Sequence, residues 1–406
     1  MKTISISLSP NTEKDDIALA KRCLSCREKI KGECIDKLEK KIKEDFQFKN
    51  VLLTNSGRSS LMLILESIGI QDGDEIIIQG FTCNAVVNPI MQSGAKPVYV
   101  DIDETLNIDV LKIEEKITNR TRAIIVQHNF GYPGDVLALK NICDKYSLLF
   151  IEDCAHALGA KINGEFCGSF GDVSFFSFGR DKVISSVYGG MIVVQNELIR
   201  EKMEQIYKGL DFPSEKWTTQ QLRHPIIMNE WVLPLYDFLN IGKIILTLSI
   251  KFGILSKAVT PGEYQGKLPD YFPKKLPNAL ACLALKQLEK LEKFNEHRRE
   301  LAKMYFKNIG GVLNIKEGAI YLKYPLMVED PESILKELEK YGFMLDDGWR
   351  KKTIVPPKTN LEKMDYKKGT CPIAERLAEH ILVLPTHVNI DEETAEKIIY
   401  LLKTYI

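Results

Sequence analysis

The sequence lacks an excess of charge of either sign. Its 406 residues include 55 Lys and Arg against 55 Asp and Glu. A balanced chain produces no overall field that would draw it to nucleic acid or to an anionic membrane, so partners have to be argued from local features. We expect no nucleic-acid partner. Because 45% of the residues are apolar, the chain can form a proper core and is expected to be globular.

Long uncharged apolar runs are also missing. Residues 1–16, MKTISISLSPNTEKDD, contain no apolar core of signal-peptide length. No uncharged run elsewhere reaches the length of a membrane span. We therefore expect a cytoplasmic protein.

Cysteines are scattered rather than regularly spaced. There are nine, an odd number, which favours reduced thiols over a disulfide framework. Cys23, Cys26 and Cys34 form a CxxC followed by a third cysteine, but a zinc site needs a fourth ligand and none is obvious nearby. We interpret these cysteines as apolar positions of an N-terminal helical region, and the sequence predicts no metal site.

The most informative stretch that the chain does contain runs from Leu148 to Val194. A continuous apolar run ends at Ile151 and is followed directly by Glu152, Asp153 and His156. This order is typical of a central parallel strand that presents polar groups at its C-terminal end, where ligands of open α/β sheets bind.

A lysine follows on a short connection between two further strands. VSFFSF predicts a strand from Val173 to Phe178, then comes Lys182, and Gly189-Gly190 open the strand MIVV. A lysine held in such a place can form an imine with the aldehyde of pyridoxal phosphate, PLP. That cofactor also needs an acid at its ring nitrogen, an anion site and a face to lie against, and Asp153 is the candidate acid. Taken singly, such an Asp is more often a cap and such a Lys a solvated charge.

The order EDCAHALGA, GSFGDVSFFSF, SFGRDK and GG resembles the signature of the DegT/DnrJ/EryC1/StrS family of PLP-dependent sugar aminotransferases. The resemblance extends over nearly the whole chain, with a gap between roughly residues 210 and 275. It implies that Asp153 is the partner of the pyridine nitrogen and that His156 contacts the ring hydroxyl. It also implies that Ser177 binds the phosphate and that Lys182 is the Schiff-base lysine. A sister group of sugar dehydratases has His in place of this lysine, so Lys182 argues against membership of that group.

A phosphate site is predicted where a short strand turns into an apolar helix. VLLTNSGRSSLMLILESIG places Gly57, Arg58 and Ser59 at the start of the helix, where free backbone N–H groups and the helix dipole favour an anion. We assign the phosphate to these three residues, with Ser177 as a second donor. The same residues would also serve as an ordinary helix cap. The resembled family usually has Thr in place of Arg58.

Two further cofactor contacts follow from the resemblance. The segment that supplies a ring-stacking aromatic residue in the family has Cys83 at the usual position and Phe81 two residues earlier, and we expect Phe81 near the ring. His128 follows the buried strand Ala123 to Val126, at the place of a family histidine. A cofactor or substrate role for His128 is weighed against a hydrogen-bonded structural role.

Strands that alternate with helices predict a mostly parallel sheet wound on both faces. The resemblance implies an α/β fold of the type I, aspartate aminotransferase-like, PLP-dependent transferases, with a large mostly parallel-sheet domain and a smaller C-terminal α/β domain. We place the large PLP-binding domain at 1–209, an apolar insert or linker at 210–275, and the small domain at 276–406. This last part opens with one long connecting helix from Asn278 to Ile309.

Within the insert lies an apolar segment, HPIIMNEWVLPLYDFLNIGKIILTLSIKFGILSKAV. Asp237, Lys243 and Lys251 interrupt it, so it is not a plain membrane span. Three interpretations stay open. In the first, the segment packs into the interface of a homodimer. In the second interpretation, residues 225–258 lie on a membrane surface with Lys243, Lys251 and Lys257 near the headgroups. In the third, the segment covers a long apolar substrate.

The resemblance implies an aminotransferase of glycan biosynthesis. Its amino donor would be glutamate, its acceptor the keto group of a nucleotide-linked sugar, and its active unit a homodimer with both sites between subunits. Two alternatives stay open: an aminotransferase for a lipid-linked or apolar keto substrate at the membrane surface, and a non-catalytic PLP-binding regulator.

Overall fold

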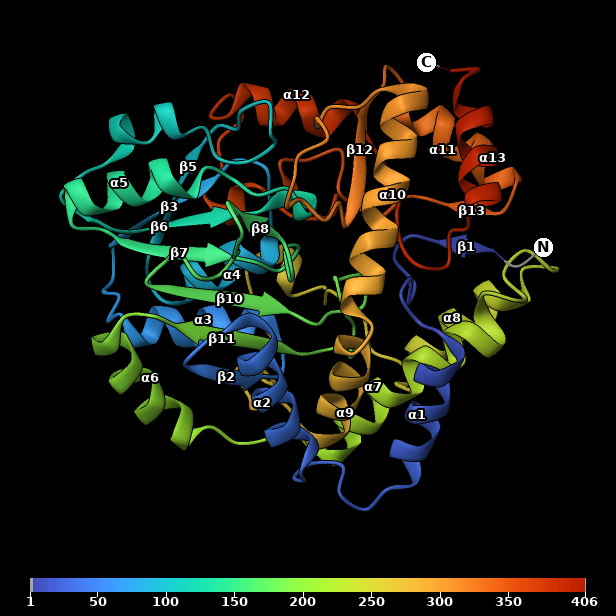
Figure 1. The fold of residues 1–406 in the computed structure, drawn as a ribbon, viewed down its shortest axis with the longest axis horizontal. Coiled ribbons are helices and arrows are strands. Elements are labelled where there is room, and N and C mark those ends of the chain that lie inside the picture. The colour runs from blue at the N-terminus through green and yellow to red at the C-terminus, as the bar shows by residue number, and fades with distance from the viewer. Residues whose placement is uncertain (1–2, 406) are drawn as a thin grey trace.

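The centre of the molecule is a seven-stranded sheet, seen in a computed structural model that describes residues 3–405. Its strand order is β2-β11-β10-β7-β6-β3-β5 (Figure 1). The strands are β2 (Val51–Thr54), β3 (Glu75–Gln79), β5 (Lys96–Val100), β6 (Thr121–Gln127), β7 (Leu149–Asp153), β10 (Val173–Ser177) and β11 (Gly190–Val194). Only β11 runs antiparallel to its neighbours. The predicted mostly parallel sheet is confirmed.

Both faces of the sheet are buried, and β6 shows how. Ala123 and Ile125 belong to one hydrophobic cluster, while Ile124 and Val126 belong to another. This alternation follows from the two-residue period of a strand, and it explains why the strand reads as a continuous apolar run. The helices that follow the sheet strands are α3 (Gly57–Ser67), α4 (Asn84–Gln92), α5 (Val136–Tyr146) and α6 (Glu197–Gly209). A small hairpin, β8 (Lys161–Ile162) with β9 (Glu165–Phe166), lies between β7 and β10 in the chain.

The N-terminal region forms two helices, α1 (Lys14–Ser25) and α2 (Cys34–Phe46), separated by a segment that contains Gly32. A disulfide between Cys34 and Cys282 joins α2 to α9 (Asn278–Leu288). The expectation of reduced thiols is wrong for this pair. The two cysteines are 248 residues apart in sequence, and only the packing of α2 against α9 brings them together.

The predicted single helix from Asn278 to Ile309 is two helices. After α9 the chain leaves helical geometry at Lys290 (φ −104°, ψ 1°), and α10 (Leu291–Ile309) begins. Leu280 of α9 belongs to the cluster beneath the N-terminal helices, whereas Tyr305 of α10 belongs to the main cluster shared with the C-terminal part. The break lets the two halves pack against different cores, which a continuous apolar period does not reveal.

The C-terminal part is built on two antiparallel strands, β12 (Lys323–Met327) and β15 (Ile381–Pro385). Its helices are α11 (Pro331–Lys340), α12 (Pro372–His380) and α13 (Glu392–Leu402). Two short pairings tie it to the rest of the chain: β1 (Ile4–Ser5) with β13 (Phe343–Met344), and β4 (Thr82–Cys83) with β14 (Ile354–Val355). The predicted domain limits of 1–209, 210–275 and 276–406 stay a prediction.

The apolar segment folds as helices against the right-hand side of the molecule in Figure 1. α7 (Glu215–Ile227) continues into a single π-helical turn at Met228–Val232, and α8 (Ile241–Lys251) follows after a loop. Met228, Val232 and Leu255 form a small buried cluster with the inner face of α8. None of the helices in residues 3–405 is both long enough and apolar enough to cross a membrane.

Candidate active site

Eight of the ten predicted site residues surround one cavity of about 800 Å³. The parallel strands β6, β7 and β10 all end at its edge, because parallel strands bring their C-terminal ends together. The eight residues are Gly57, Arg58, Cys83, His128, Asp153, His156, Ser177 and Lys182. The other two, Ser59 and Phe81, are fully buried behind the cavity wall.

The predicted lysine lies against the predicted histidine. Lys182 Nζ is 2.8 Å from His156 Nε2. On the other side of the imidazole, the Phe130 N–H donates to His156 Nδ1 at 3.3 Å, which orients the ring toward the lysine. Burial, reinforced by the neighbouring Lys182, lowers the pKa of His156 well below its usual value. A neutral imidazole is therefore held next to the amine.

Asp153 is the last residue of β7 and is almost completely buried. The Ala155 N–H donates to its Oδ1 at 3.0 Å. Burial raises the pKa of Asp153 to about 6, because a carboxylate that has lost its water is destabilised. A cation placed against this carboxylate would restore the ionised form, and a protonated pyridine nitrogen is such a cation.

His128 is engaged on both sides of its ring. Its Nε2 lies 3.2 Å from Glu152 Oε2, and its Nδ1 accepts the Gly134 N–H at 3.1 Å. The Glu152 carboxylate in turn accepts three backbone N–H groups from residues 168–171. These contacts favour the structural alternative for His128. Since its ring also borders the cavity, a cofactor contact through the ring face stays a prediction.

The predicted phosphate site lies at the start of α3, close to the end of β10. A Cβ built on Gly57 would lie 3.2 Å from Ser177 Cβ, and one built on Gly190 would lie 2.6 Å from the carbonyl carbon of Ser56. The two glycines therefore allow the helix N-terminus and the β10–β11 connection to approach closely, which leaves a cradle with free backbone donors.

Two members of the predicted phosphate set are already occupied within the protein. The Arg58 guanidinium forms an ion pair with the buried carboxylate of Glu263 and donates to the Ala258 carbonyl at 3.1 Å. The Ser59 hydroxyl donates to Asn55 Oδ1 at 2.6 Å. Of the four predicted phosphate contacts, Gly57 and Ser177 are therefore better placed than Arg58 and Ser59 to bind a phosphate. The phosphate assignment as a whole stays a prediction.

Of the two residues considered for the ring face, only Cys83 lines the cavity, and the contact of either residue with the ring stays a prediction. Cys83 borders the cavity, whereas Phe81 lies behind it and packs edge-on against Trp349, with ring centroids 5.5 Å apart. Trp349 itself borders the cavity, 5.0 Å from the His156 ring. Sequence reasoning missed Trp349, because it comes from a loop of the C-terminal part that no local pattern connects to the motif.

A buried ion-pair cluster beside the lysine was also missed. Lys323 of β12 is 2% exposed, and its Nζ lies 2.9 Å from Asp181 Oδ2 and 3.0 Å from Asp347 Oδ2. Although burial lowers the pKa of Lys323, the two carboxylates raise it above its usual value, so the lysine stays charged. Asp181 directly precedes Lys182, and the cluster therefore ties the C-terminal part to the loop that carries Lys182. The signal in the sequence was a charged residue in the otherwise apolar strand KYPLM.

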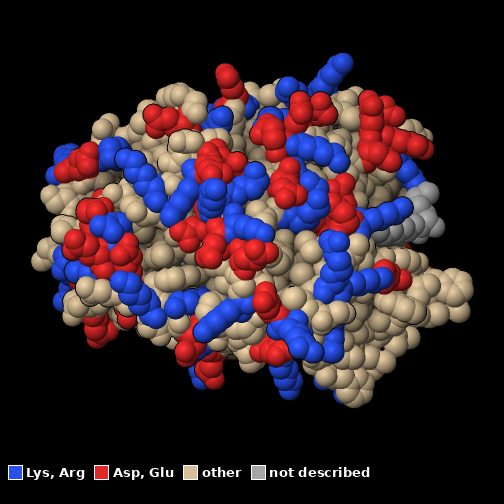
Figure 2. Space-filling view, turned by 60° about the horizontal axis from the view of Figure 1, so that its bottom comes forward, with Lys and Arg blue, Asp and Glu red and all other residues tan. Residues whose placement is uncertain are grey.

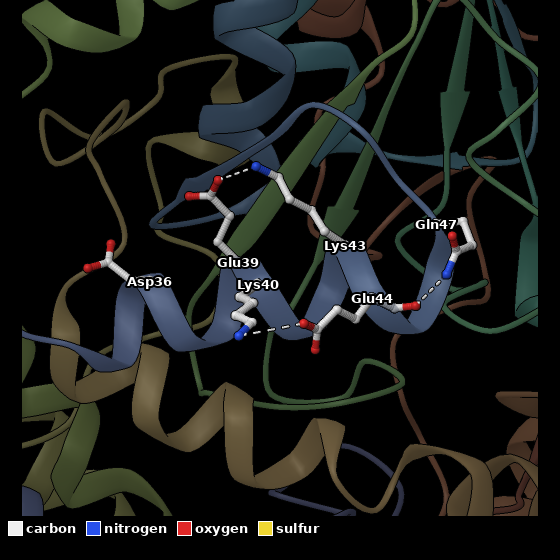
Figure 3. Close-up of a pocket in the computed structure, with 6 residues that line it drawn as sticks. All are labelled: Asp36, Glu39, Lys40, Lys43, Glu44 and Gln47. Atoms are coloured by element: carbon white, nitrogen blue, oxygen red, sulfur yellow. Dashed lines mark hydrogen bonds and ion pairs between the residues drawn. The ribbon is translucent and has the colours of Figure 1, made fainter.

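A second depression on the outer face of α2 does not resemble a site. Figure 3 shows that its charged side chains pair along the helix, Lys43 with Glu39 at 2.6 Å and Lys40 with Glu44 at 3.8 Å. Pairs at this spacing are typical of a solvated helix face.

The arrangement in the main cavity fits pyridoxal phosphate. It combines a lysine amine, a desolvated carboxylate that favours a cationic neighbour, and a backbone cradle at a helix N-terminus. Fold and site together define the class of lysine-dependent PLP transferases. A sequence model of the DegT/DnrJ/EryC1/StrS aminotransferase family matches residues 10–227 and 258–403. The chain belongs to this family and is a PLP-dependent aminotransferase. The unmatched segment, residues 228–257, is narrower than the predicted gap between roughly residues 210 and 275.

Known relatives agree with this assignment. GDP-perosamine synthase of Escherichia coli O157:H7 is 29% identical over 367 residues, which cover 89% of this chain and 87% of that protein. GDP-perosamine synthase of Vibrio cholerae is 39% identical over 173 residues, 42% of this chain and 47% of that protein. The PLP form of the putative sugar aminotransferase Spr1654 from Streptococcus pneumoniae has the same fold, with a TM-score of 0.75 at 21% identity over 98% of this chain and 97% of that one.

Proposed function

We propose that this aminotransferase moves an amino group from glutamate to the keto group of a nucleotide-linked sugar. The observation that carries the proposal is the contact of 2.8 Å between Lys182 Nζ and His156 Nε2 in the same cavity as Asp153. The acceptor class is supported by the relatives named perosamine synthases. A homodimer and a cytoplasmic location are further predictions, the first to be checked by sedimentation of the PLP-loaded protein.

Bound PLP supplies an aldehyde that takes up the amino group and a ring that accepts the electrons released at the substrate α-carbon. Lys182 Nζ would hold the aldehyde carbon and then, once released, carry the proton to and from the substrate carbon. Asp153 would keep a proton on the ring nitrogen, and His156 would contact the ring hydroxyl. Gly57 and Ser177 would donate to the phosphate, while Cys83 and Trp349 border the space for the ring.

The alternative of an apolar or lipid-linked keto acceptor has one observation in its favour. Leu246 and Ile250, from the segment outside the family match, line the same cavity as Lys182. The alternative of a non-catalytic PLP-binding regulator is disfavoured, because both Lys182 and Asp153 lie in the cavity in a position to act.

The first test compares the wild-type protein with Lys182→Ala. We expect the wild type, loaded with PLP, to show the visible absorbance of lysine-bound cofactor and to lose it when glutamate is added. The variant should lack that absorbance and lose at least about 1,000-fold in activity. If the wild type binds PLP through another lysine, the site assignment is wrong.

The acceptor is tested separately, with the glutamate-treated enzyme and two sets of ketones. Recovery of the original absorbance with nucleotide-linked keto-sugars supports the proposal, and recovery only with a lipid-linked ketone in vesicles supports the alternative. An enzyme that responds to glutamate but to neither set would contradict both acceptor classes, while no response to glutamate would favour the regulator.

A further inference from the structure

The exposed apolar side chains of the molecule gather in one place. Seven of the eighteen large apolar residues that are exposed among the described ones lie between residues 231 and 254: Trp231 55%, Phe238 61%, Leu239 76%, Ile244 53%, Leu248 44%, Phe252 71% and Ile254 37%. We call these residues the apolar lobe. Figure 2 shows it as a protrusion at the lower right with almost no charged side chains, whereas the rest of that face is densely covered by both signs. Soluble surfaces seldom carry such a patch without a partner.

The helix at the centre of the lobe has two apolar faces. On α8, Leu246 and Ile250 turn inward, packing on the Met228 cluster and lining the catalytic cavity. Ile244 and Leu248 turn outward, one helical turn apart, and are 53% and 44% exposed. The inner face accounts for the folding of the segment, so the apolar character of the outer face needs a different explanation.

The charges are unevenly distributed over the lobe: exposed Glu230 and Asp237 lie at its N-terminal end, next to Trp231 and Phe238, whereas its C-terminal part carries lysines. Between Asp237 and Glu263 the chain contains no acidic residue, but it contains Lys243, Lys251 and Lys257. Lys243 lies 3.6 Å from Glu339. Lys251 and Lys257 are exposed, and neither forms an ion pair with another residue in 3–405. Outward apolar residues beside unneutralised lysines are the pattern of a helix that lies in the interface of an anionic bilayer.

A second copy of the chain fits the lobe less well. The two halves of a symmetric dimer present the same surface to each other, and the part of this surface between Asp237 and Glu263 carries lysines but no carboxylate to pair with them. Moreover, the family match omits residues 228–257, which form most of this segment. An interface shared by the family would be built from the matched residues, so the match gives no support for the lobe as such an interface.

We propose that the apolar lobe docks the enzyme on the surface of an anionic lipid bilayer. The exposed aromatic residues enter the headgroup region, and Lys251 and Lys257 contact lipid phosphates. Because the inner face of α8 lines the catalytic cavity, docking holds the active site next to the membrane. The docking itself does not depend on the identity of the acceptor, and its test requires no transamination.

The test is flotation of the full-length, PLP-loaded protein with vesicles. We expect it to float with phosphatidylcholine vesicles that contain about 30% phosphatidylglycerol and to float much less with phosphatidylcholine alone. Phe238→Ser with Phe252→Ser should lower the partition coefficient at least about tenfold. Lys251→Gln should lower it about fivefold. The matched control is Leu198→Ser with Tyr400→Ser, which removes side chains of similar exposure (76% and 73%) elsewhere and should float like the wild type.

Tryptophan fluorescence reports the same contact without flotation. Trp231 is the exposed one of the three tryptophans, since Trp217 and Trp349 are 9% and 5% exposed. The anionic vesicles should shift its emission to the blue, and Trp231→Phe should abolish the shift. Lack of flotation, or equal flotation of the Phe238/Phe252 variant and the wild type, would overturn the proposal. If that variant instead dissociates an oligomer and no form binds vesicles, the lobe is an interface between copies.

Discussion

At the scale of single residues, burial away from water, together with neighbouring charges, decides which ionisable side chains of the site are charged and which are neutral. Asp153 and His156 are both buried, and burial shifts their pKa values in opposite directions, each toward the neutral form. Lys323 is equally buried but stays charged, because Asp181 and Asp347 lie within 3.0 Å of its Nζ. Of the three carboxylates that line the cavity, Asp181 and Asp347 pair with Lys323, whereas Asp153 forms no ion pair within residues 3–405. Asp153 is the carboxylate that the cofactor nitrogen would face.

The effect of Asp153 on the stability of the folded protein can be tested with the Asp153→Asn variant, without measuring activity. The pKa of Asp153 is raised from 3.8 to about 6 in the folded protein, so folding binds a proton between these pH values. The resulting stabilisation is complete below about pH 4 and is lost as the pH rises through about 6. At pH 8 the PLP-free Asn variant, which cannot ionise, should therefore be more stable than the wild type by about 1–3 kcal/mol.

Denaturant unfolding of the PLP-free proteins at pH 5 and pH 8 measures this difference, which should shrink at the lower pH. Saturating PLP should reverse the order at pH 8, because its ring nitrogen stabilises the carboxylate and not the amide. A wild type that is more stable than the variant at pH 8 without cofactor would show that Asp153 already has a cationic partner.

At the scale of elements, the cradle depends on how closely α3 approaches the β10–β11 connection. Gly190 opens β11, and Gly57 opens α3. These two elements are far apart in the chain, and their contact is made by backbone rather than by side chains. The absence of a Cβ at both places is therefore a requirement of the site and not only of the turns.

Gly190→Ala should widen the cradle. Its Cβ would lie 2.6 Å from the Ser56 carbonyl carbon and 2.8 Å from the Gly57 nitrogen, so the start of α3 must move away. We expect PLP to bind about tenfold or more weakly, since the phosphate donors lose their alignment. Equilibrium titration with PLP measures the effect. The control is Gly209→Ala, where a Cβ would meet nothing within 4 Å, and equal affinities for both variants would place the phosphate elsewhere.

At the scale of the whole molecule, contacts between distant segments hold the site together. The ion pair between Lys323 and Asp181 connects the C-terminal part to the loop that carries Lys182. Strand β14 pairs with β4 beside the cavity, and the Cys34–Cys282 disulfide connects α2 to α9. The disulfide lies away from the cavity, because neither cysteine borders it. We therefore expect it to affect stability more than catalysis.

Cys34→Ser with Cys282→Ser should lower the free energy of unfolding by about 2–4 kcal/mol, because the cross-link restricts the unfolded chain. A reducing agent should lower the melting temperature of the wild type and leave that of the variant unchanged. Cys26→Ser, at an exposed free cysteine, is the control and should behave like the wild type. Equal melting temperatures of the wild type with and without reductant would show that the disulfide is absent in solution.

The sequence by itself determined the family, the parallel sheet and the lysine at its edge. Strands, helices and the order of Asp153, His156, Ser177 and Lys182 are local features, and a short-range pattern or motif carries them. Eight of the ten named site residues surround one cavity, and their roles toward the cofactor stay predictions.

Only the tertiary structure decided what the remaining residues contact. Four features depend on segments that are distant in the chain. They are the pairing of Arg58 with Glu263, the position of Trp349 at the cavity, the Cys34–Cys282 bond and the division into α9 and α10. Such contacts follow from how helices pack on the sheet, and the period of apolar residues is the same whichever neighbour covers them. For the same reason, the sequence showed that residues 225–258 are apolar, but only the fold showed which side of α8 faces the cavity and which faces outward.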